Sequence, residues 1–382
     1  MNKNKKIVCP YCFEESTISR LNFECTNKRC KNFGNAFQIS AKNKFEERLN
    51  DVCPDCGERS FKVVCPNCKN PLPDSTLNGD DMIISVIGAR DTGKSNYIGV
   101  LIHEFLGRVA PAFGGSFIGF DKSLSEYNQR FGDPLYKGHI RVAQTETALN
   151  RQENPLPLIF SLSLKHKSLF GSKINKFTFV FYDTAGEDLE DFETVSTVGK
   201  YICKSKGIIF LLDPLKISDV ENLLDSDEVK RASSTDEVTS SAEIMKFASN
   251  LIRNDKKMSD EKQIDIPVAV VFSKFDVIDT IVPDGSFVKN NSPHCPNGVF
   301  SVSDAETVNN EVQGLLDAWN DRELITFIDN NFKRHAFFCA SAFGLNNNAE
   351  LGSGKINTPN PHRIEDAFLW ILAENKVIPT AK

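Results

Sequence analysis

The chain has 382 residues, of which 40% are hydrophobic and 25% charged, and this composition argues against a disordered or fibrous protein. The net charge of −6 is uneven, because residues 1–75 carry 13 Lys/Arg against 9 Asp/Glu and the remainder is acidic. An acidic body disfavours nucleic acid as the main partner. No apolar run approaches the ~18 residues of a membrane span, and the charged start MNKNKK is unlike a signal segment. We therefore expect a cytoplasmic protein without a transmembrane segment.

Eight of the eleven cysteines lie in the first 68 residues, as closely spaced pairs. These pairs are Cys9/Cys12, Cys25/Cys30, Cys53/Cys56 and Cys65/Cys68. Four thiolates complete a tetrahedral zinc shell, so the spacing predicts two structural zinc ions rather than a disulfide framework. Sequential grouping joins the first pair to the second and the third to the fourth, and cross-pairing remains an alternative. We expect tandem four-cysteine zinc ribbons over 1–75, an irregular linker over 70–79 and a second domain over 79–382.

A phosphate-binding loop is predicted directly after this linker. Residues 82–87 form an apolar, β-branched run, GARDTGKS follows, and the next residues have helical periodicity. Glycines and a helix N-terminus let backbone N–H groups face phosphates. Lys94 is expected to reach the β- and γ-phosphates and the Ser95 hydroxyl to ligate Mg²⁺. The nucleotide-binding residues predicted here are Gly88, Asp91, Thr92, Gly93, Lys94, Ser95 and Asn96.

Further strands are predicted at 158–166, 176–183, 207–213, 266–276 and 335–343. The second of these ends in DTAGE, where Asp183 can hold Mg²⁺ and the Gly186 N–H can sense a γ-phosphate. The fourth ends in SKFD, where Asp276 can accept hydrogen bonds from guanine, with Ser273 and Lys274 beside it. The last strand gives Ser341 and Ala342, whose backbone N–H groups can meet guanine O6.

These motifs, GARDTGKS, DTAGE, SKFD and SA in this order, resemble those of the translation-factor class of Ras-like P-loop GTPases over about residues 80–375. The zinc ribbons and large insertions resemble the bacterial double-GTPase group. The resemblance implies an α/β P-loop NTPase domain with a mostly parallel six-stranded sheet flanked by helices. It also implies GTP/GDP and Mg²⁺ as ligands, nucleotide-dependent protein partners and a link to bacterial conflict or defence systems.

Several positions depart from the family pattern. The usual Asn of the base motif is Ser273, and the usual water-positioning Gln is Glu187, with Lys94 and Gly186 in their expected places. A carboxylate near the γ-phosphate is repelled, so slow intrinsic hydrolysis is expected. Arg90 is either an arginine finger in cis or a surface side chain. The Mg²⁺-sensing switch threonine is either Thr145 or Thr147.

Three functions follow from these features. The first is a Mg²⁺-dependent GTPase switch whose zinc ribbons and insertions engage a protein partner. The second is a nucleotide-gated nucleic-acid-binding zinc-ribbon protein, which is less favoured because eight thiolates around two zinc ions cancel the positive charge of the ribbons. The third is a non-hydrolysing GTP sensor or scaffold, suggested by Glu187. An ATPase is the least favoured alternative, because it requires Asp276 to have no base-reading role.

Overall fold

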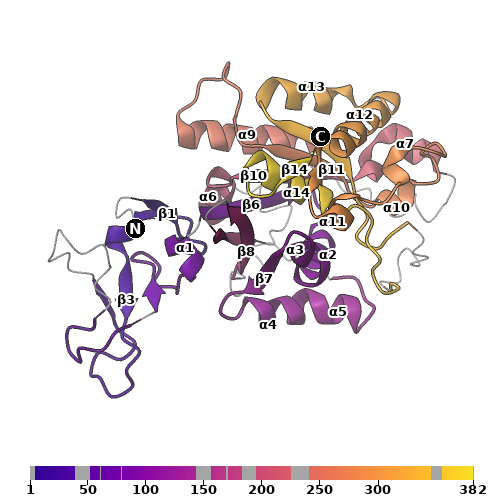
Figure 1. The fold of residues 1–382 in the computed structure, drawn as a ribbon. Helices are drawn as coiled ribbons and strands as arrows, with labels where there is room; N and C mark the ends of the chain where they lie inside the picture. Colours follow the sequence, from indigo (N-terminus) through magenta and orange to yellow (C-terminus); the bar gives the residue numbers. More distant parts are fainter. Residues whose placement is uncertain are drawn as a thin grey trace.

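The computed structural model describes residues 5–38, 52–60, 62–78, 80–142, 156–168, 171–182, 195–224, 241–345 and 355–381. A small N-terminal cysteine-rich part, here called the zinc module (residues 5–72), lies beside a larger α/β body (Figure 1). Among the described helices, none is long and apolar enough to cross a bilayer.

The zinc module contains short strands and its own small core. Its strands are β1 (Lys6–Val8), β2 (Glu15–Thr17), β3 (Asn22–Glu24), β4 (Ala36–Gln38) and β5 (Val63–Val64), with a 3₁₀ turn η1 at Ile18–Arg20. β1 pairs with β2, while β3 pairs with both β4 and β5. The pairing of β3 with β5 is a long-range contact, because it places Asn22 and Phe23 beside Val64 and Val63.

The body is built on a mainly parallel sheet, as predicted, but in the described chain it has seven strands rather than six. Their order is β13-β11-β10-β6-β9-β8-β7. Their bounds are β6 Asp80–Gly88, β7 Gly115–Gly119, β8 Leu158–Ser168, β9 Gly171–Phe181, β10 Gly207–Leu212, β11 Val268–Phe272 and β13 His335–Cys339. Pairing is parallel from β13 to β9 and antiparallel at β8 and β7. The additional strand, β7, lies in a region where the sequence predicted no strand.

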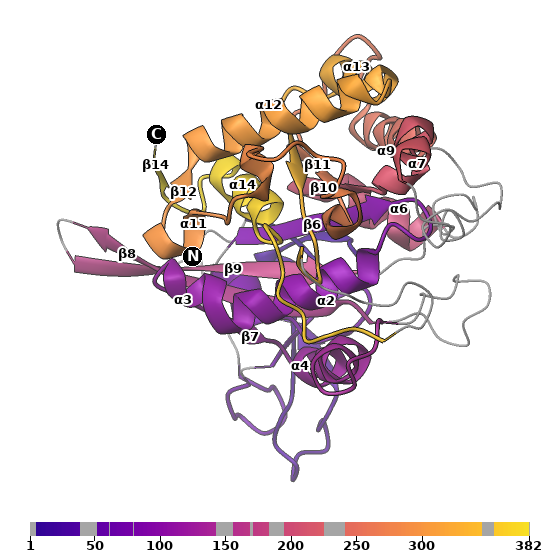
Figure 2. The same ribbon diagram turned by 90° about the vertical axis from the view of Figure 1, so that its right-hand side faces the viewer.

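The predicted apolar runs form the core of this sheet. Every residue of β10 and of β11 is buried, as expected for parallel strands covered on both faces. On one side, the π-helical turn η2 (Phe105–Val109) continues α2 (Lys94–Glu104) and packs against α14 (Asp366–Glu374), where the ring centres of Phe105 and Phe368 lie 4.8 Å apart. The Tyr97 hydroxyl in α2 donates to Ile364 O, just before α14, at 3.1 Å. Figure 2 shows α12 (Val302–Ala318) and α13 (Arg322–Asn331) along the upper side of the molecule and α2 below them, near the middle of the view.

The helices follow the predicted segments with some changes of boundary. The helices with α labels are α1 Asp74–Asn78, α2 Lys94–Glu104, α3 Ala110–Ala112, α4 Ser123–Tyr127, α5 Asp133–Tyr136, α6 Val195–Cys203, α7 Ser218–Leu223, α9 Ser241–Lys256, α10 Phe275–Ile278, α11 His294–Asn297, α12 Val302–Ala318, α13 Arg322–Asn331 and α14 Asp366–Glu374. Two short strands, β12 (Phe300–Ser301) and β14 (Thr380–Ala381), pair with each other.

Short 3₁₀ and π-helical turns complete the described secondary structure. They are η2 Phe105–Val109, η3 Asn128–Gly132, η5 Pro214–Lys216 and η6 Phe287–Lys289.

The expected linker is partly helical. Within 70–79, where we predicted irregular chain, α1 packs on the sheet. The Ser75 hydroxyl bonds the Ser161 hydroxyl at 2.8 Å and accepts from the Thr178 hydroxyl at 2.7 Å. These bonds fix the connection between module and body to β8 and β9.

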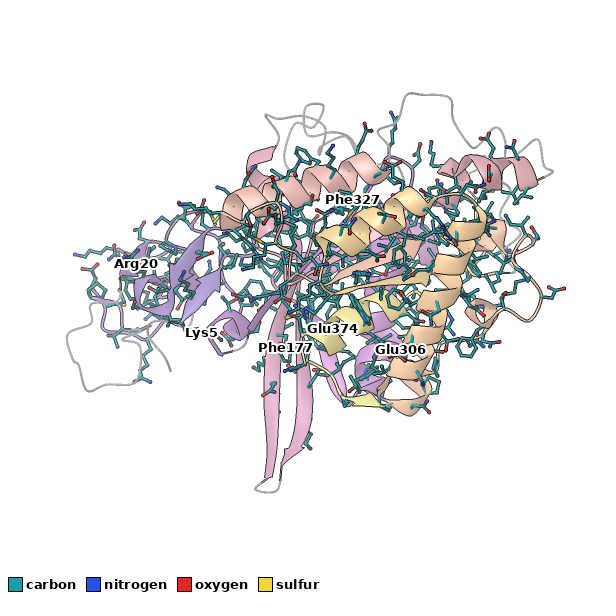
Figure 3. All side chains as sticks on the ribbon, turned by 90° about the horizontal axis from the view of Figure 1, so that it is seen from above. Lys5, Arg20, Phe177, Glu306, Phe327 and Glu374 are labelled. Carbon is teal, nitrogen blue, oxygen red and sulfur yellow. The ribbon has the colours of Figure 1, made fainter. Side chains whose placement is uncertain are left out.

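The hairpin of β8 and β9 projects beyond the body (Figure 3), with Phe177 near its base. β7 pairs with β8 only as far as Leu164, and β6 pairs with β9 only from Phe177 onward. Beyond these points the two strands pair with each other alone. The sequence over 165–176 carries four lysines and one histidine without an acidic residue.

Candidate zinc and nucleotide sites

The eight N-terminal cysteines form two four-sulfur groups, as predicted, but the sequential grouping was wrong. One group is Cys9, Cys12, Cys65 and Cys68, called the outer site, and the other is Cys25, Cys30, Cys53 and Cys56, called the inner site. Within each group all sulfur atoms lie within 4.8 Å of one another. The arrangement is therefore nested: the first and last pairs share one site, and the middle pairs share the other.

The sulfur spacing fits zinc. Zn–S bonds of about 2.3 Å in a tetrahedron place sulfurs about 3.8 Å apart. The Cys9–Cys68, Cys12–Cys65 and Cys25–Cys56 sulfurs are separated by 3.7, 3.9 and 3.9 Å. The two groups can thus each hold one zinc ion, with all four positions filled by sulfur.

Three cysteine turns share one backbone shape. Each runs Cys-Pro-x-Cys and continues into a residue with a left-handed φ, namely Phe13, Gly57 or Lys69. In each, the N–H of that residue donates to the carbonyl of the first cysteine, at 2.9, 2.9 and 3.1 Å. This turn aims both thiols at one point. Only Gly57 adopts the conformation without steric cost.

Hydrogen bonds between the sulfurs of the outer site raise the pKa of Cys9 and lower the pKa of Cys12, Cys65 and Cys68, so they favour the thiolate form at three of the four ligands. The bond from Cys9 lowers the pKa of Cys12 to about 4 and that of Cys68 to about 6. The Asn67 and Asn70 side-chain amides also lie 3.6 and 3.5 Å from the Cys12 and Cys68 sulfurs. Because zinc binds the deprotonated form, these contacts prepare the site for the metal.

The loop after β6 has the conformation that its glycines suggested. Asp91 and Gly93 have left-handed φ values of 64° and 79°, and α2 begins at Lys94. Lys94 is 8% exposed, and its ammonium donates to Gly88 O at 2.8 Å and Ala89 O at 2.7 Å. A Cβ at Gly88 would lie 2.6 Å from the backbone oxygen of Leu211, so this position requires glycine.

The other predicted loop residues are arranged around this turn. The Thr92 hydroxyl donates to Ala89 O at 2.9 Å, Ser95 is partly buried, and Arg90 is exposed. Asn96 Oδ1 accepts the N–H of Val142 at 3.0 Å. That bond joins α2 to the described chain just before the segment that holds Thr145 and Thr147.

The SKFD and SA motifs meet at the carboxyl ends of β11 and β13. The Ser341 hydroxyl donates to Asp276 Oδ1 at 2.5 Å, and burial raises the pKa of Asp276. The Ser273 hydroxyl donates to Leu212 O at 3.1 Å and so ties β11 to β10. Ser341 N–H donates to His362 O at 3.0 Å. Of the two backbone amides that the sequence predicts to meet guanine O6, that of Ser341 is therefore already bonded within the protein.

Two residues near this motif were missed from the sequence. Asp213, at the end of β10, accepts from the Lys274 ammonium at 2.6 Å and from Leu215 N–H at 3.1 Å. The Arg141 guanidinium lies 5.4 Å from the ring centre of Phe343 and lowers the pKa of Asp276 against the effect of burial. Asp213 ends a buried strand, a position that signals ligand chemistry, whereas nothing in the local sequence marks Arg141.

The residues predicted to act on the γ-phosphate and Mg²⁺ lie outside the described residues, apart from Lys94, Arg90 and Ser95. They are Asp183, Gly186, Glu187, Thr145 and Thr147. Their roles therefore stay predictions from the sequence.

A third cluster does not fit a metal. His294 Nε2 lies 3.7 Å from Asp304 and 3.8 Å from Asp366, and all three side chains are buried. His294 Nδ1 accepts the Ser301 N–H at 3.1 Å, which places the ring proton on Nε2. The Arg363 guanidinium already donates to both carboxylates, at 3.0 and 2.7 Å. The cluster is a buried ion network, and His294 lies at the start of the short helix α11.

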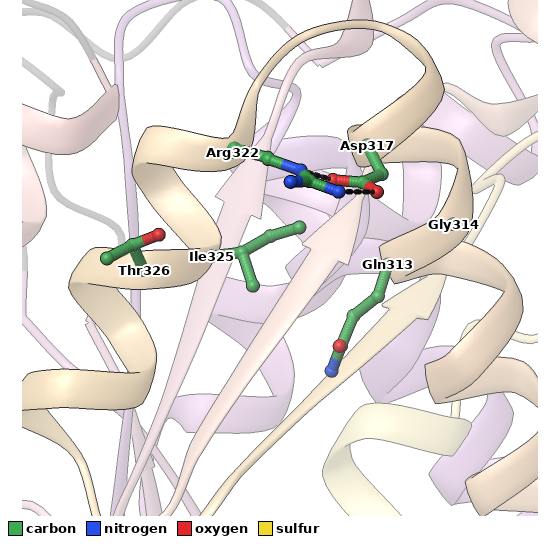
Figure 4. A pocket seen from close by; sticks show the side chains of 6 residues that line it. All are labelled: Gln313, Gly314, Asp317, Arg322, Ile325 and Thr326. Carbon is green, nitrogen blue, oxygen red and sulfur yellow. Dashed lines mark hydrogen bonds and ion pairs between the residues drawn. The ribbon is translucent and has the colours of Figure 1, made fainter.

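A surface hollow of about 360 Å³ lies between α12 and α13, away from the predicted motifs (Figure 4). The Arg322–Asp317 ion pair crosses it, with Gln313, Ile325 and Thr326 around it. It is open, and it brings together none of the residues predicted for nucleotide or metal.

No protein-family model matches the chain. The chain is similar to a protein of Mycolicibacterium smegmatis described as a candidate ESX-1 scaffolding and assembly protein, SaeC, with 29% identity over 163 residues. The matched region is 42% of this chain and 40% of that protein, so the chain spans less than half of the relative's length.

Proposed function

We propose that the chain binds Mg²⁺–GTP at the carboxyl edge of the parallel strands and acts as a slow GTP-hydrolysing switch. The observation that carries this proposal is the convergence of four strand ends. The Lys94 loop follows β6, Asp213 follows β10, Asp276 follows β11 and Ser341 follows β13. In open α/β sheets this edge is where ligands bind.

The loop 88–96 would hold the phosphates. The Lys94 ammonium is buried at the loop carbonyls, and a bound phosphate would offer it charged oxygens in their place. Ser95 would contribute a hydroxyl to Mg²⁺, together with Asp183 and one of Thr145 and Thr147. Mg²⁺ would neutralise phosphate charge during transfer.

The guanine specificity rests on Asp276. Its carboxylate faces the Ser341 hydroxyl, and Arg141 and Lys274 favour its ionised form. An ionised carboxylate accepts from guanine N1–H and N2–H₂, whereas adenine presents an acceptor at the corresponding edge and leaves the charge unpaired. Ser273 replaces the Asn of related GTPases, and its hydroxyl supports β10.

We expect a protein partner that distinguishes the GTP-bound chain from the GDP-bound chain. The relative described as a scaffolding and assembly protein supports a role in assembling other proteins. The zinc module and the segments between the strands supply surface for such a partner. We therefore assign the chain to protein rather than nucleic-acid recognition.

The test is nucleotide identification followed by calorimetry. Purified protein is denatured and the released nucleotide is chromatographed, and binding of Mg²⁺–GTP and Mg²⁺–ATP to the emptied protein is then compared. We expect guanine nucleotide in the preparation and at least about tenfold preference for GTP, which corresponds to about 1.4 kcal/mol. Lys94→Ala should abolish binding. Equal affinity for GTP and ATP would refute the base assignment.

A second candidate is a GTP-binding scaffold that does not hydrolyse its ligand. The description of the relative favours it, as does the carboxylate of Glu187 in place of glutamine. Single-turnover hydrolysis separates the two. We expect a rate on the order of 10⁻⁴–10⁻² s⁻¹ for the switch, and no product above the protein-free control for the scaffold.

A further inference from the structure

Phe13 belongs to the core of the body although it lies within a zinc-binding turn. It follows Cys12 directly, has a left-handed φ of 56° and is fully buried. It packs with the core of the body and not with the separate core of the zinc module. The strained backbone of a bulky residue persists only where its surroundings hold it in place.

Two tyrosines of the body surround this ring. The Phe13 ring centre lies 5.3 Å from that of Tyr201 and 6.2 Å from that of Tyr182, and the two tyrosine rings lie 5.8 Å apart. The Tyr201 hydroxyl donates to Ile84 O in β6 at 2.7 Å. The three rings form a compact group, here called the aromatic plug.

The plug contacts chain segments next to the proposed nucleotide site. Tyr182 immediately precedes Asp183, and Ile84 lies four residues before Gly88 on β6. Tyr201 lies on α6, the helix that follows the DTAGE segment in the sequence. A shift of Tyr182 or of α6 therefore acts on Phe13 through direct ring contact, and a shift of β6 acts on it through Tyr201.

Polar contacts reinforce the attachment of the same turn. Val8 N–H donates to Asp81 Oδ2 at 2.9 Å at the start of β6. Lys200 on α6 pairs with Glu14 at 2.6 Å, and Lys204, the residue after α6, pairs with Glu15 at 3.1 Å. The outer zinc site is thus joined to β6, to the end of β9 and to α6.

We propose that the aromatic plug couples zinc binding at the outer site to nucleotide binding in the body. Zinc holds Cys9 and Cys12 in the turn that presents Phe13, and Phe13 holds Tyr182 and Tyr201 beside β6. This inference rests on the proposed function. Coupling of binding free energies is reciprocal, so bound nucleotide retains the outer zinc ion and the zinc ion strengthens nucleotide binding.

The experiment measures zinc release from full-length protein to the dye 4-(2-pyridylazo)resorcinol, with and without saturating Mg²⁺–GTP. The release phase of the outer site is identified by its absence in Cys68→Ser. In the unaltered protein we expect nucleotide to slow this phase at least about 5-fold, at the lower end of typical coupling. The inner-site phase should change little, because its cysteines have no described contact with the plug.

The variants isolate the role of the ring. Phe13→Ala should bring the ratio of outer-site release rates to about one and weaken Mg²⁺–GTP binding by calorimetry. Phe13→Leu, which retains an apolar side chain, should fold and give an intermediate ratio. Phe37→Ala is the matched control, because Phe37 stacks on Phe23 inside the zinc module. It should keep the original ratio.

The outcomes distinguish this inference from the proposed function. Calorimetry without nucleotide binding to the unaltered protein would overturn the proposed function, and the coupling with it. Normal GTP binding with an outer-site release rate insensitive to nucleotide would overturn the coupling alone. If the ratio of outer-site release rates stayed unchanged in both Phe13 variants, the coupling would not depend on the aromatic plug and this proposal would be wrong.

Discussion

At the scale of single residues, Asp276 has opposite consequences for stability and for binding. Burial raises its pKa, so the ionised form is unfavourable in the empty protein, yet guanine needs that form. We expect Asp276→Asn to weaken GTP binding by about 1–3 kcal/mol, roughly 5- to 150-fold, and to favour xanthosine triphosphate. The thermal midpoint of the empty variant should not fall. Calorimetry and thermal unfolding measure both effects, and unchanged GTP affinity would contradict the assignment.

The same carboxyl group predicts a pH dependence. With its pKa raised, Asp276 takes up a proton at a higher pH than an ordinary aspartate, near 3.9. Because protonation removes an acceptor, GTP affinity should decline as pH is lowered through the raised value. Affinity measured as the pH is lowered stepwise from neutral should show this decline at a higher pH than an ordinary aspartate would give. The Asp276→Asn variant with GTP carries the same phosphates, and its residual pH dependence supplies the correction for them.

The backbone around Lys94 agrees with the sequence prediction of a strand, a glycine loop and a helix, because one local motif determines it. The turn around Lys94 follows from glycine, helix start and strand end, all within 88–96. Lys274 shows where prediction from local sequence fails, because its ammonium pairs with Asp213, which lies 61 residues away in the chain. Sequence spacing alone does not reveal such a partner.

At the scale of elements, the projecting part of the β8–β9 hairpin should be dispensable for folding. Beyond Lys165 and Ile174, which pair directly, the described strands pair only with each other. Replacing residues 166–173 by Asn-Gly gives a two-residue hairpin turn. We expect the thermal midpoint to change by less than about 4 °C, because the lost contacts contribute less than about 1 kcal/mol.

The matched control lies in the same hairpin but inside the body. The Phe160 ring is fully buried and stacks on Phe117 with centres 4.7 Å apart. Phe160→Ala should lower the free energy of unfolding by about 3–5 kcal/mol. If shortening the hairpin lowered the free energy of unfolding as much as Phe160→Ala does, the prediction that the projecting part is dispensable for folding would be wrong.

Six strands were predicted and one was missed for a clear reason. The long apolar runs are easy to predict as strands, because parallel strands buried on both faces are continuously hydrophobic. β7, with the sequence GSFIG, has two glycines and only five residues. It is a strand because Gly115–Gly119 pairs with β8 more than forty residues later, so its formation depends on tertiary contacts.

At the scale of the whole molecule, the sequence predicted the zinc ligands but not how they combine. Each neighbouring set of four cysteines satisfies zinc equally well on local spacing. The choice is made by β3, which pairs with β5 and brings the last cysteine turn beside the first. The attachment of Phe13 to the body could not be predicted from the sequence either, because its partners, Tyr182 and Tyr201, lie far from it in the chain.

Nested and sequential zinc sites make different predictions for one double variant. Cys56 and Cys68 belong to different sites in the nested arrangement and would share one site in the sequential arrangement. The intact protein should hold two zinc ions, each single serine variant one, and the double variant none, by native mass spectrometry. One ion retained in the double variant would restore the sequential grouping. Cys68→Ser should also lower the thermal midpoint of the body more than Cys56→Ser does, because only the outer site holds Phe13 in place.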